Sequence, residues 1–180
     1  MFYRNPVEKF RLLSAQEQAG RGRSDVEIVI VCVGRVRENN LTALCHDYAG
    51  RIERCGHAVK VIEVKEEPGG RPDDLVVGRE SARLAERIPA GAWTVAMDLR
   101  GQVMTSRKFA AGFGRLVERG TRSVCFLIGG PLGLSADLLA SCRQRLALSR
   151  MTLTHEMARL LLLEQLYRAN TIIRGEPYHK

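Results

Sequence analysis

The most informative stretch of this 180-residue sequence is Phe126-Leu127-Ile128-Gly129-Gly130-Pro131-Leu132-Gly133. Its apolar beginning is typical of a strand buried on both faces of a parallel sheet. Its glycine-rich end predicts a tight turn, because glycine permits positive φ and lets backbone amides approach a ligand closely. The glycine spacing matches neither the dinucleotide-binding fingerprint nor the P-loop. From these residues alone, an ordinary strand-to-helix turn and a binding loop are equally compatible with the pattern.

Strand-like and helix-like patterns alternate on both sides of this stretch. We expect strands at 28–33, 59–64, 93–98, 123–128 and 146–148. We expect helices at about 41–52, 73–87, 105–119, 135–142 and 155–173. The candidate N-caps are Asp73 or Asp74, Thr105 or Ser106, and Thr154. The alternation predicts an α/β fold with a mainly parallel sheet and helices on both faces.

The composition is that of a soluble globular protein with a basic surface. Lys and Arg number 28 and Asp and Glu 20, a net charge of +8 that favours a polyanionic partner, although a solvated basic surface gives the same count. No apolar run reaches the roughly 18–20 residues of a membrane-spanning helix, so we expect no membrane protein. The five cysteines form no C-x-x-C pair, which argues against a zinc cluster and suits a reducing cytoplasm.

The first 25 residues differ in composition from the rest of the sequence. They contain scattered charges, including Glu8 and Glu17, and no apolar segment long enough for a secretory signal. We expect an N-terminal extension at 1–25, disordered or partly helical, followed by a single domain at 26–180.

Three further features are candidates for function. His155 follows a predicted strand, and its sequence position is compatible with a surface residue or a ligand-binding residue. Since ligands of open α/β sheets gather at the carboxyl ends of strands, a functional His155 requires the glycine turn to lie nearby. The last helix is apolar around most of its circumference, which predicts either a subunit interface or a central position in the monomer. The tail at 175–180 fits a frayed terminus or an aromatic and cationic contact to RNA.

Five segments together resemble one family closely. They are 30–34, 127–135, 148–155 with Arg159, 164–169 and 177–180. Their residues and order are similar to those of the RlmH or YbeA-like family, the ribosomal RNA large-subunit methyltransferases H of the SPOUT superfamily. The resemblance covers residues 26–180. Two departures are Thr154, where the family often has proline, and the extension at 1–25.

The resemblance implies a specific fold and activity. The SPOUT-type α/β knot threads the C-terminal part of the chain as a deep trefoil, an exception to unknotted topology. Members are homodimers that bind S-adenosyl-L-methionine in the knot and methylate N3 of a pseudouridine in 23S rRNA. We therefore expect a cytoplasmic enzyme acting on free rRNA, the large subunit or the whole ribosome, with no metal. The apolar last helix then becomes the dimer interface.

The resemblance also implies site residues. The expected cofactor-binding residues are Met97, Asp98, Gly130, Ser149, Arg150, Met151, Thr152, Leu153 and Thr154. Backbone groups in these segments are expected to read the adenine edge, between apolar walls. The expected catalytic residues are His155, Arg159, Tyr178 and His179. They are expected to orient the base and stabilise its carbonyl oxygens while N3 loses its proton, and which of them accepts that proton is left open.

Two other functions are compatible with the residues. One is a noncatalytic ribosome- or RNA-binding protein of the same fold, against which the intact glycine turn and the 149–154 segment argue. The other is an α/β enzyme that binds a nucleotide or phosphate in the glycine turn, against which the absent fingerprints argue.

Overall fold

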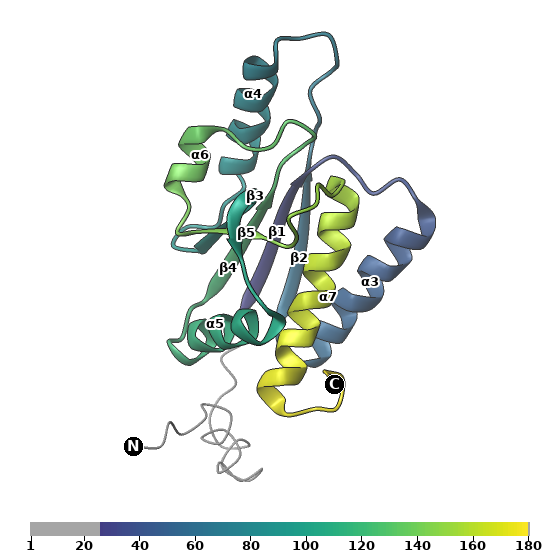
Figure 1. The fold of residues 1–180 in the computed structure, drawn as a ribbon, viewed down its shortest axis with the longest axis vertical. Helices are drawn as coiled ribbons and strands as arrows, with labels where there is room; N and C mark the ends of the chain where they lie inside the picture. Colours follow the sequence, from purple (N-terminus) through teal and green to yellow (C-terminus); the bar gives the residue numbers. More distant parts are fainter. Residues whose placement is uncertain (1–25, 180) are drawn as a thin grey trace.

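The fold is built on a five-stranded parallel sheet. The computed structural model describes residues 26–179, so the expected extension at 1–25 and Lys180 lie outside the described residues. The strands are β1 (Glu27–Val33), β2 (Ala58–Val64), β3 (Trp93–Val103), β4 (Ser123–Ile128) and β5 (Gln144–Ala147). They pair in the order β2-β1-β4-β3-β5, and every pair is parallel (Figure 1).

Helices cover both faces of the sheet. They are α3 (Asn39–Arg54), α4 (Asp73–Ala85), α5 (Ser106–Glu118), α6 (Ala136–Ser141) and α7 (His155–Arg174). Helices α3, α5 and α7 pack against one face, whereas α4 and α6 pack against the other (Figure 1). The predicted α/β class, with a parallel sheet and helices on both faces, is therefore confirmed. No helix within the described residues is long and apolar enough to cross a membrane.

The two central strands, β1 and β4, form the middle of the core. Nearly all of their residues are buried, because helices cover both faces of each strand. Ile28 and Ile30 join the core cluster on the α3 and α7 side, whereas Val29 and Val31 join the cluster on the α4 side. Burial raises the pKa of the Cys32 thiol to about 12, so this thiol stays protonated near neutral pH. Burial on two faces accounts for the continuous apolar runs in the sequence.

Strand β3 is longer than predicted. Its expected end, residue 98, lies inside the strand, because pairing with β5 resumes after an irregularity between Met97 and Gln102. Gly101 allows the backbones of β3 and β5 to approach each other closely, since a Cβ atom there would lie 2.7 Å from the backbone nitrogen of Leu146. Strand β5 also begins earlier than predicted, because its pairing with β3 includes the polar residue Gln144.

The helix starts agree with the predicted caps, with one exception. Thr105 and Thr154 cap α5 and α7, and each side chain accepts a hydrogen bond from the backbone N–H three residues later. The prediction that Asp73 or Asp74 caps α4 is wrong. Pro72 is the N-cap, and both aspartates lie in the first turn, where their charge complements the helix dipole.

The apolar circumference of α7 is explained by its position within the subunit. This helix lies between α3 and α5 and contacts β1 and β4 (Figure 1). Leu162, Leu163 and Leu166 are fully buried between these elements. Of the two expectations for the last helix, the central position in the monomer is confirmed, and the subunit interface stays a prediction.

Candidate active site at the carboxyl ends of the strands

The predicted cofactor-binding residues meet at one edge of the sheet. Met97 and Asp98 lie where the pairing of β3 with β4 ends, Gly130 follows β4, and residues 149–154 follow β5. Because β4, β3 and β5 are neighbours in a parallel sheet, the three segments leave it side by side at its carboxyl edge. In an open α/β sheet this edge is where ligands bind.

The glycine turn after β4 is compact. The backbone N–H of Gly133 donates to the carbonyl oxygen of Gly130 at 2.9 Å, and Gly133 has a φ of +83°. A Cβ atom on Gly129 would lie 2.5 Å from the carbonyl oxygen of Gly133, and one on Gly130 would lie 2.6 Å from Glu80 Oε2. The backbone contact at Gly129 and the positive φ at Gly133 therefore require glycine, whereas a larger residue at Gly130 would displace the Glu80 carboxylate.

Helix α4 supports the glycine turn with two polar side chains. Ser81 Oγ accepts a hydrogen bond from the backbone N–H of Ser135 at 2.9 Å. Glu80 is 2% exposed, and its Oε1 atom accepts from the backbone N–H of Glu67 at 2.9 Å. Its buried Oε2 atom has no hydrogen-bond partner among residues 26–179. A carboxylate oxygen buried in this way loses its hydration, which makes Glu80 a candidate binding or positioning group.

Sequence reasoning missed Glu80. The available signal was its position, because Val77 precedes it by three residues and Leu84 follows it by four. This spacing places a carboxylate on the apolar face of a helix. Such a group needs a polar partner once the helix packs.

Asp98 presents a second buried carboxylate oxygen at this edge. Its Oδ1 atom accepts a hydrogen bond from the backbone N–H of Arg100 at 3.2 Å, within the irregular part of β3. Its Oδ2 atom is buried and has no hydrogen-bond partner in the described part of the chain. The preceding residue, Met97, pairs with Ile128 and Leu146 on either side, so two strands hold this segment in place.

The segment between β5 and α7 crosses the carboxyl edge. Strand β5 is at one end of the sheet order, whereas His155 at the start of α7 lies beside Gly34 at the end of β1. Residues 148–154 therefore span the ends of β3 and β4, about 14 Å at the usual strand spacing. Within this segment Ser149 Oγ accepts a hydrogen bond from the Met151 N–H at 2.9 Å, and Met151 is 76% exposed. The segment thus passes the strand ends that carry the other predicted cofactor residues.

His155 faces the end of β1 and the loop after β2. Its Nε2 atom is buried, lacks a hydrogen-bond partner within residues 26–179, and lies 3.9 Å from Glu66 Oε1. A Cβ atom on Gly34 would come within 3.0 Å of this nitrogen and would overlap the Glu66 carboxylate. Gly34 also has a φ of +79°, so glycine is required there. His155 is thus held in a tight polar site with one ring nitrogen unused.

Arg159 lies one turn further along α7 and is 3% exposed. Its Nη1 atom donates to Glu63 Oε1 at 2.7 Å, and its Nη2 atom donates to the carbonyl oxygen of Gly34 at 2.9 Å. The Nε atom is buried and has no partner among the residues that the structure describes. The structure therefore places Arg159 near His155, but it engages both amino groups in joining α7 to the ends of β1 and β2.

Tyr178 lies beside the middle of α7, and His179 lies beside α5, both away from His155 of the same chain. The Tyr178 hydroxyl donates to Glu164 Oε1 at 3.1 Å, and His179 Nε2 accepts a hydrogen bond from α5 at 3.4 Å. Glu164 follows His155 by nine residues, about 13 Å along a helix. Partial burial, together with the hydroxyl and carboxylate beside it, raises the pKa of Tyr178, so its phenol stays protonated. The structure does not bring the two tail residues to His155 of their own chain.

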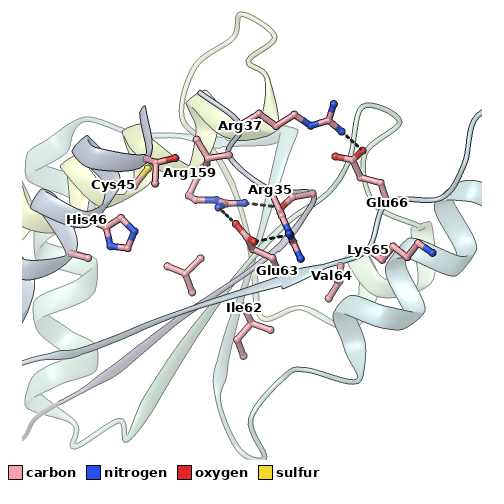
Figure 2. Close-up of a pocket in the computed structure, with 15 residues that line it drawn as sticks. Arg35, Arg37, Cys45, His46, Ile62, Glu63, Val64, Lys65, Glu66 and Arg159 are labelled. Atoms are coloured by element: carbon pink, nitrogen blue, oxygen red, sulfur yellow. Dashed lines mark hydrogen bonds and ion pairs between the residues drawn. The ribbon is translucent and has the colours of Figure 1, made fainter. Parts of the chain in front are cut away.

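A groove of about 1190 Å³ opens beside this site, between α3 and the edge strand β2 (Figure 2). We call it the β2 groove. Its lining includes Gly34 and Arg159 from the site, together with Arg35, Arg37 and Lys65. None of the predicted cofactor-binding residues lines it, so the groove and the glycine turn are separate parts of this end of the molecule.

These features define a class of protein. A parallel α/β sheet with a glycine turn, a crossing segment and unpartnered buried polar atoms at its carboxyl edge is typical of a ligand-binding α/β enzyme. Within residues 26–179, no three His, Cys, Asp or Glu side chains are grouped to hold a metal ion.

Comparison with known proteins identifies the family. Residues 26–179 match the family model described as a predicted SPOUT methyltransferase. Three relatives are each named ribosomal RNA large subunit methyltransferase H. The protein from Syntrophotalea carbinolica is 41% identical over 86% of this chain and 99% of its own length. The proteins from Gemmatimonas aurantiaca and Desulfotalea psychrophila are 44% and 41% identical, over 86% and 84% of this chain and 100% and 97% of their own lengths. The chain therefore belongs to the RlmH family of SPOUT methyltransferases, as its motifs predicted.

Proposed function

We propose that the protein is an S-adenosyl-L-methionine-dependent methyltransferase that methylates N3 of a pseudouridine in 23S large-subunit rRNA, on assembled ribosomes in the cytoplasm. The observation that carries the proposal is the set of buried, unpartnered polar atoms on Glu80, Asp98 and His155 at the carboxyl edge of the described sheet. Such atoms are costly unless a ligand satisfies them. They occur in a methyltransferase family, in a chain whose relatives are named for large-subunit rRNA.

The polar groups at this edge of the sheet fit the cofactor. S-adenosyl-L-methionine carries cationic sulfonium and amino groups, and the oxygens Glu80 Oε2 and Asp98 Oδ2 are acceptors for cationic or hydroxyl groups. The backbone of Gly130 and of residues 149–154 offers N–H and C=O groups for the adenine edge. When bound, the cofactor supplies a methyl group on sulfur. We therefore propose that Met97, Asp98, Gly130 and residues 149–154 hold it, with Glu80 as an additional polar contact.

The reaction requires loss of the N3 proton. N3 of a uracil-type ring is a poor nucleophile while it carries a proton, so a residue must assist the removal of that proton. The Nε2 atom of His155, which has no hydrogen-bond partner within residues 26–179, suits this role, and Glu66 Oε1 lies 3.9 Å from it. The His155 side chain is 17% exposed, so little water competes for the proton. We assign His155 as the proton acceptor and Glu66 as a positioning residue.

Arg159 acts on this site through its neighbours. Its bonds to Glu63 and to the Gly34 carbonyl hold the end of β1, against which His155 packs. These two bonds fix the guanidinium between α7 and the ends of β1 and β2. We therefore assign Arg159 to positioning His155 instead of to direct contact with the base.

Tyr178 and His179 reach a cofactor site only if two chains associate. Within one chain the Tyr178 hydroxyl lies 3.1 Å from Glu164 and 3.4 Å from the Tyr48 hydroxyl, far along α7 from His155. A homodimer with antiparallel α7 helices about a twofold axis brings the tail of one subunit to the other subunit's His155. In this arrangement the Tyr178 hydroxyl of the partner subunit releases its hydrogen bond to Glu164 of its own chain and donates to a carbonyl oxygen of the base instead, and His179 of the partner subunit lies beside it.

The path of the chain supports a further part of the proposal. Residues 148–154 cross the ends of β3 and β4 before α7 begins beside β1. A knot, which is rare in proteins, also requires the chain to pass through a loop, and a segment that crosses the strand ends is compatible with such threading. We propose that this C-terminal part is threaded as the trefoil expected for the family.

Two measurements test the proposal. Isothermal titration with S-adenosyl-L-methionine measures cofactor binding, and methyl transfer to ribosomes from cells lacking this gene, mapped by mass spectrometry, measures activity. We expect saturable binding and one methyl group on a single large-subunit pseudouridine. Cofactor binding without rRNA methylation would contradict the proposed substrate. A folded protein with neither property would contradict the enzyme and favour a noncatalytic ribosome-binding protein of the same fold.

A further inference from the structure

The β2 groove has a cationic rim that the proposed cofactor site does not use. Arg35 and Arg37 come from the loop after β1, and Lys65 comes from the loop after β2 (Figure 2). The lining also contains Arg159 at its inner end and two carboxylates, so positive charge is in surplus. A groove with this balance attracts anions.

The rim arginines are more exposed to solvent than the carboxylates that they contact. The side chains of Arg35 and Arg37 are 85% and 79% exposed, whereas those of Glu63 and Glu66 are 35% and 34% exposed. Arg35 Nε lies 3.7 Å from Glu63, and Arg37 Nη2 lies 3.5 Å from Glu66. Exposed ion pairs of this kind are weak, so each guanidinium is free to bind a second anion. The carboxylates therefore orient the arginines without covering their outer faces.

The rim adjoins the proposed proton acceptor. Arg35 directly follows Gly34, which packs against Nε2 of His155. The backbone N–H of Arg37 donates to Glu156 Oε2 at 3.3 Å, and Glu156 is the neighbour of His155 on α7. A nucleotide whose base reaches His155 therefore has flanking phosphates close to these arginines.

We infer that the β2 groove binds the rRNA backbone on one side of the target nucleotide, with Arg35, Arg37 and Lys65 contacting phosphate oxygens. Guanidinium groups bind phosphate through two parallel hydrogen bonds, and the lysine adds a point charge. The net charge of +8 attracts the same polyanion over a longer range. The inference rests on the proposed function, because it takes the target base to lie at His155.

Three double variants of the full-length protein test this assignment. Arg35→Ala with Arg37→Ala removes two charges from the rim. The matched control, Arg87→Ala with Arg119→Ala, removes two exposed arginines that lie after the ends of α4 and α5, near the amino ends of β3 and β4. Filter binding measures the affinity of each protein for deproteinised 23S rRNA and for ribosomes, between about 50 and 200 mM salt, where phosphate contacts change the affinity strongly.

The rim variant is expected to bind rRNA about tenfold more weakly than the wild type. The slope of log affinity against log salt should fall by about 1.4, because each contact to single-stranded phosphate contributes about 0.7. The control pair should change affinity by less than about twofold. Arg35→Lys with Arg37→Lys should keep most of the slope, because lysine retains the charge.

Equal affinities and slopes for the rim variant and the wild type overturn the inference. An equal loss in both alanine pairs also overturns it, because net charge alone then explains the binding. A loss seen with ribosomes but not with deproteinised rRNA overturns it and indicates a ribosomal protein as the partner of the rim. Titration with S-adenosyl-L-methionine tests the proposed enzymatic function separately from the binding of rRNA by the β2 groove. Failure of cofactor binding rejects the enzyme, whereas the RNA affinities of the rim variant still decide whether the groove binds rRNA.

Discussion

The two ends of α7 differ in how their polar groups are satisfied. At its start, His155 Nε2 and Arg159 Nε are buried without hydrogen-bond partners among the described residues. From its middle toward its other end, polar groups are paired, since Glu164 accepts hydrogen bonds from Arg168 Nε at 2.9 Å and from the Tyr178 hydroxyl at 3.1 Å. We call these the open end and the closed end of the helix. The open end faces the carboxyl edge of the sheet. At the closed end, contacts within the subunit satisfy Glu164, whereas His179 Nδ1 is also buried without a hydrogen-bond partner among residues 26–179.

This difference indicates that the open end of the helix serves ligand binding, whereas the closed end serves the stability of the subunit. A buried polar atom without a partner costs about 1–3 kcal/mol, so folded proteins keep few of them. Their occurrence at the open end indicates atoms that gain partners from a ligand. At the closed end, Tyr178 packs edge-on against Tyr167 with ring centroids 4.8 Å apart, which holds the tail in place.

The largest expected effect is the loss of the arginine at the open end. Arg159→Ala leaves the Gly34 carbonyl without its donor and leaves Glu63 with only the exposed Arg35 at 3.7 Å, so it should lower the free energy of unfolding by about 3 kcal/mol. Arg168→Ala at the closed end should lower it by only about 1 kcal/mol, because Glu164 keeps another donor. Urea unfolding at one protein concentration measures both values. Equal losses would remove the energetic distinction between the two ends.

The next effect concerns the proposed proton acceptor. His155→Gln should slow methyl transfer to ribosomes by about a hundredfold, because general-base assistance is lost, while cofactor affinity stays within about twofold. Arg87→Gln, which changes an exposed residue after the end of α4, is the control and should retain full activity. Full turnover by His155→Gln would contradict the assignment.

A smaller effect is expected from filling the glycine turn. A Cβ atom on Gly130 meets Glu80 Oε2 at 2.6 Å and Val33 Cγ1 at 3.3 Å, so the Glu80 carboxylate or the turn must move. Gly130→Ala should weaken cofactor binding by about thirtyfold, or about 2 kcal/mol. Gly78→Ala on α4 is the control, since nothing lies within 4 Å of its Cβ position. It should leave affinity unchanged and stabilise the helix by about 0.5–1 kcal/mol. Calorimetric titration measures the cofactor affinity of both variants, and equal affinities would contradict the proposed site.

The smallest effect compares two helix caps. Thr154 caps α7 at the open end, and Thr105 caps α5 away from the site, each with a cap hydrogen bond of 3.2 Å. Each Thr→Ala change should lower stability by about 1 kcal/mol. Only Thr154→Ala should also reduce methyl transfer, because it loosens the turn that carries His155. Equal activities for the two variants, measured below their unfolding temperatures, would show that this turn does not position the imidazole.

The parts of the fold that depend on local pattern were predictable from the sequence. Strand β4 has the predicted limits, and α7 begins at His155 with Thr154 as its cap. Apolar runs and capping oxygens carry this information locally. The extension of β3 was not predictable, because it depends on Gly101 approaching β5, a tertiary pairing that no local pattern contains.

The candidate site was predictable only in part. Family motifs located His155, Arg159 and Gly130, and the structure places them at neighbouring strand ends. Three carboxylates face or contact these residues: Glu63, Glu66 and Glu80. They come from β2, its following loop and α4, so their proximity depends on strand order and not on sequence spacing. The position of the tail on its own subunit likewise follows from side-chain packing that no motif encodes.

The central claim is that the open end of α7 in one subunit is completed by the tail from the closed end of the other. Mixing two variants that are each expected to be inactive, His155→Gln and Tyr178→Ala, tests it most directly. After joint unfolding and refolding of equal amounts, about half of the dimers contain one chain of each kind. If the sites lie between chains, each mixed dimer has one site with both substitutions and one site with neither.

The account therefore predicts that the mixture recovers about a quarter of the wild-type rate of methyl transfer to ribosomes, although each variant alone stays inactive. Native mass spectrometry confirms that mixed dimers have formed. Mixed dimers without any recovered activity would place His155 and Tyr178 in the site of a single chain and would contradict the claim.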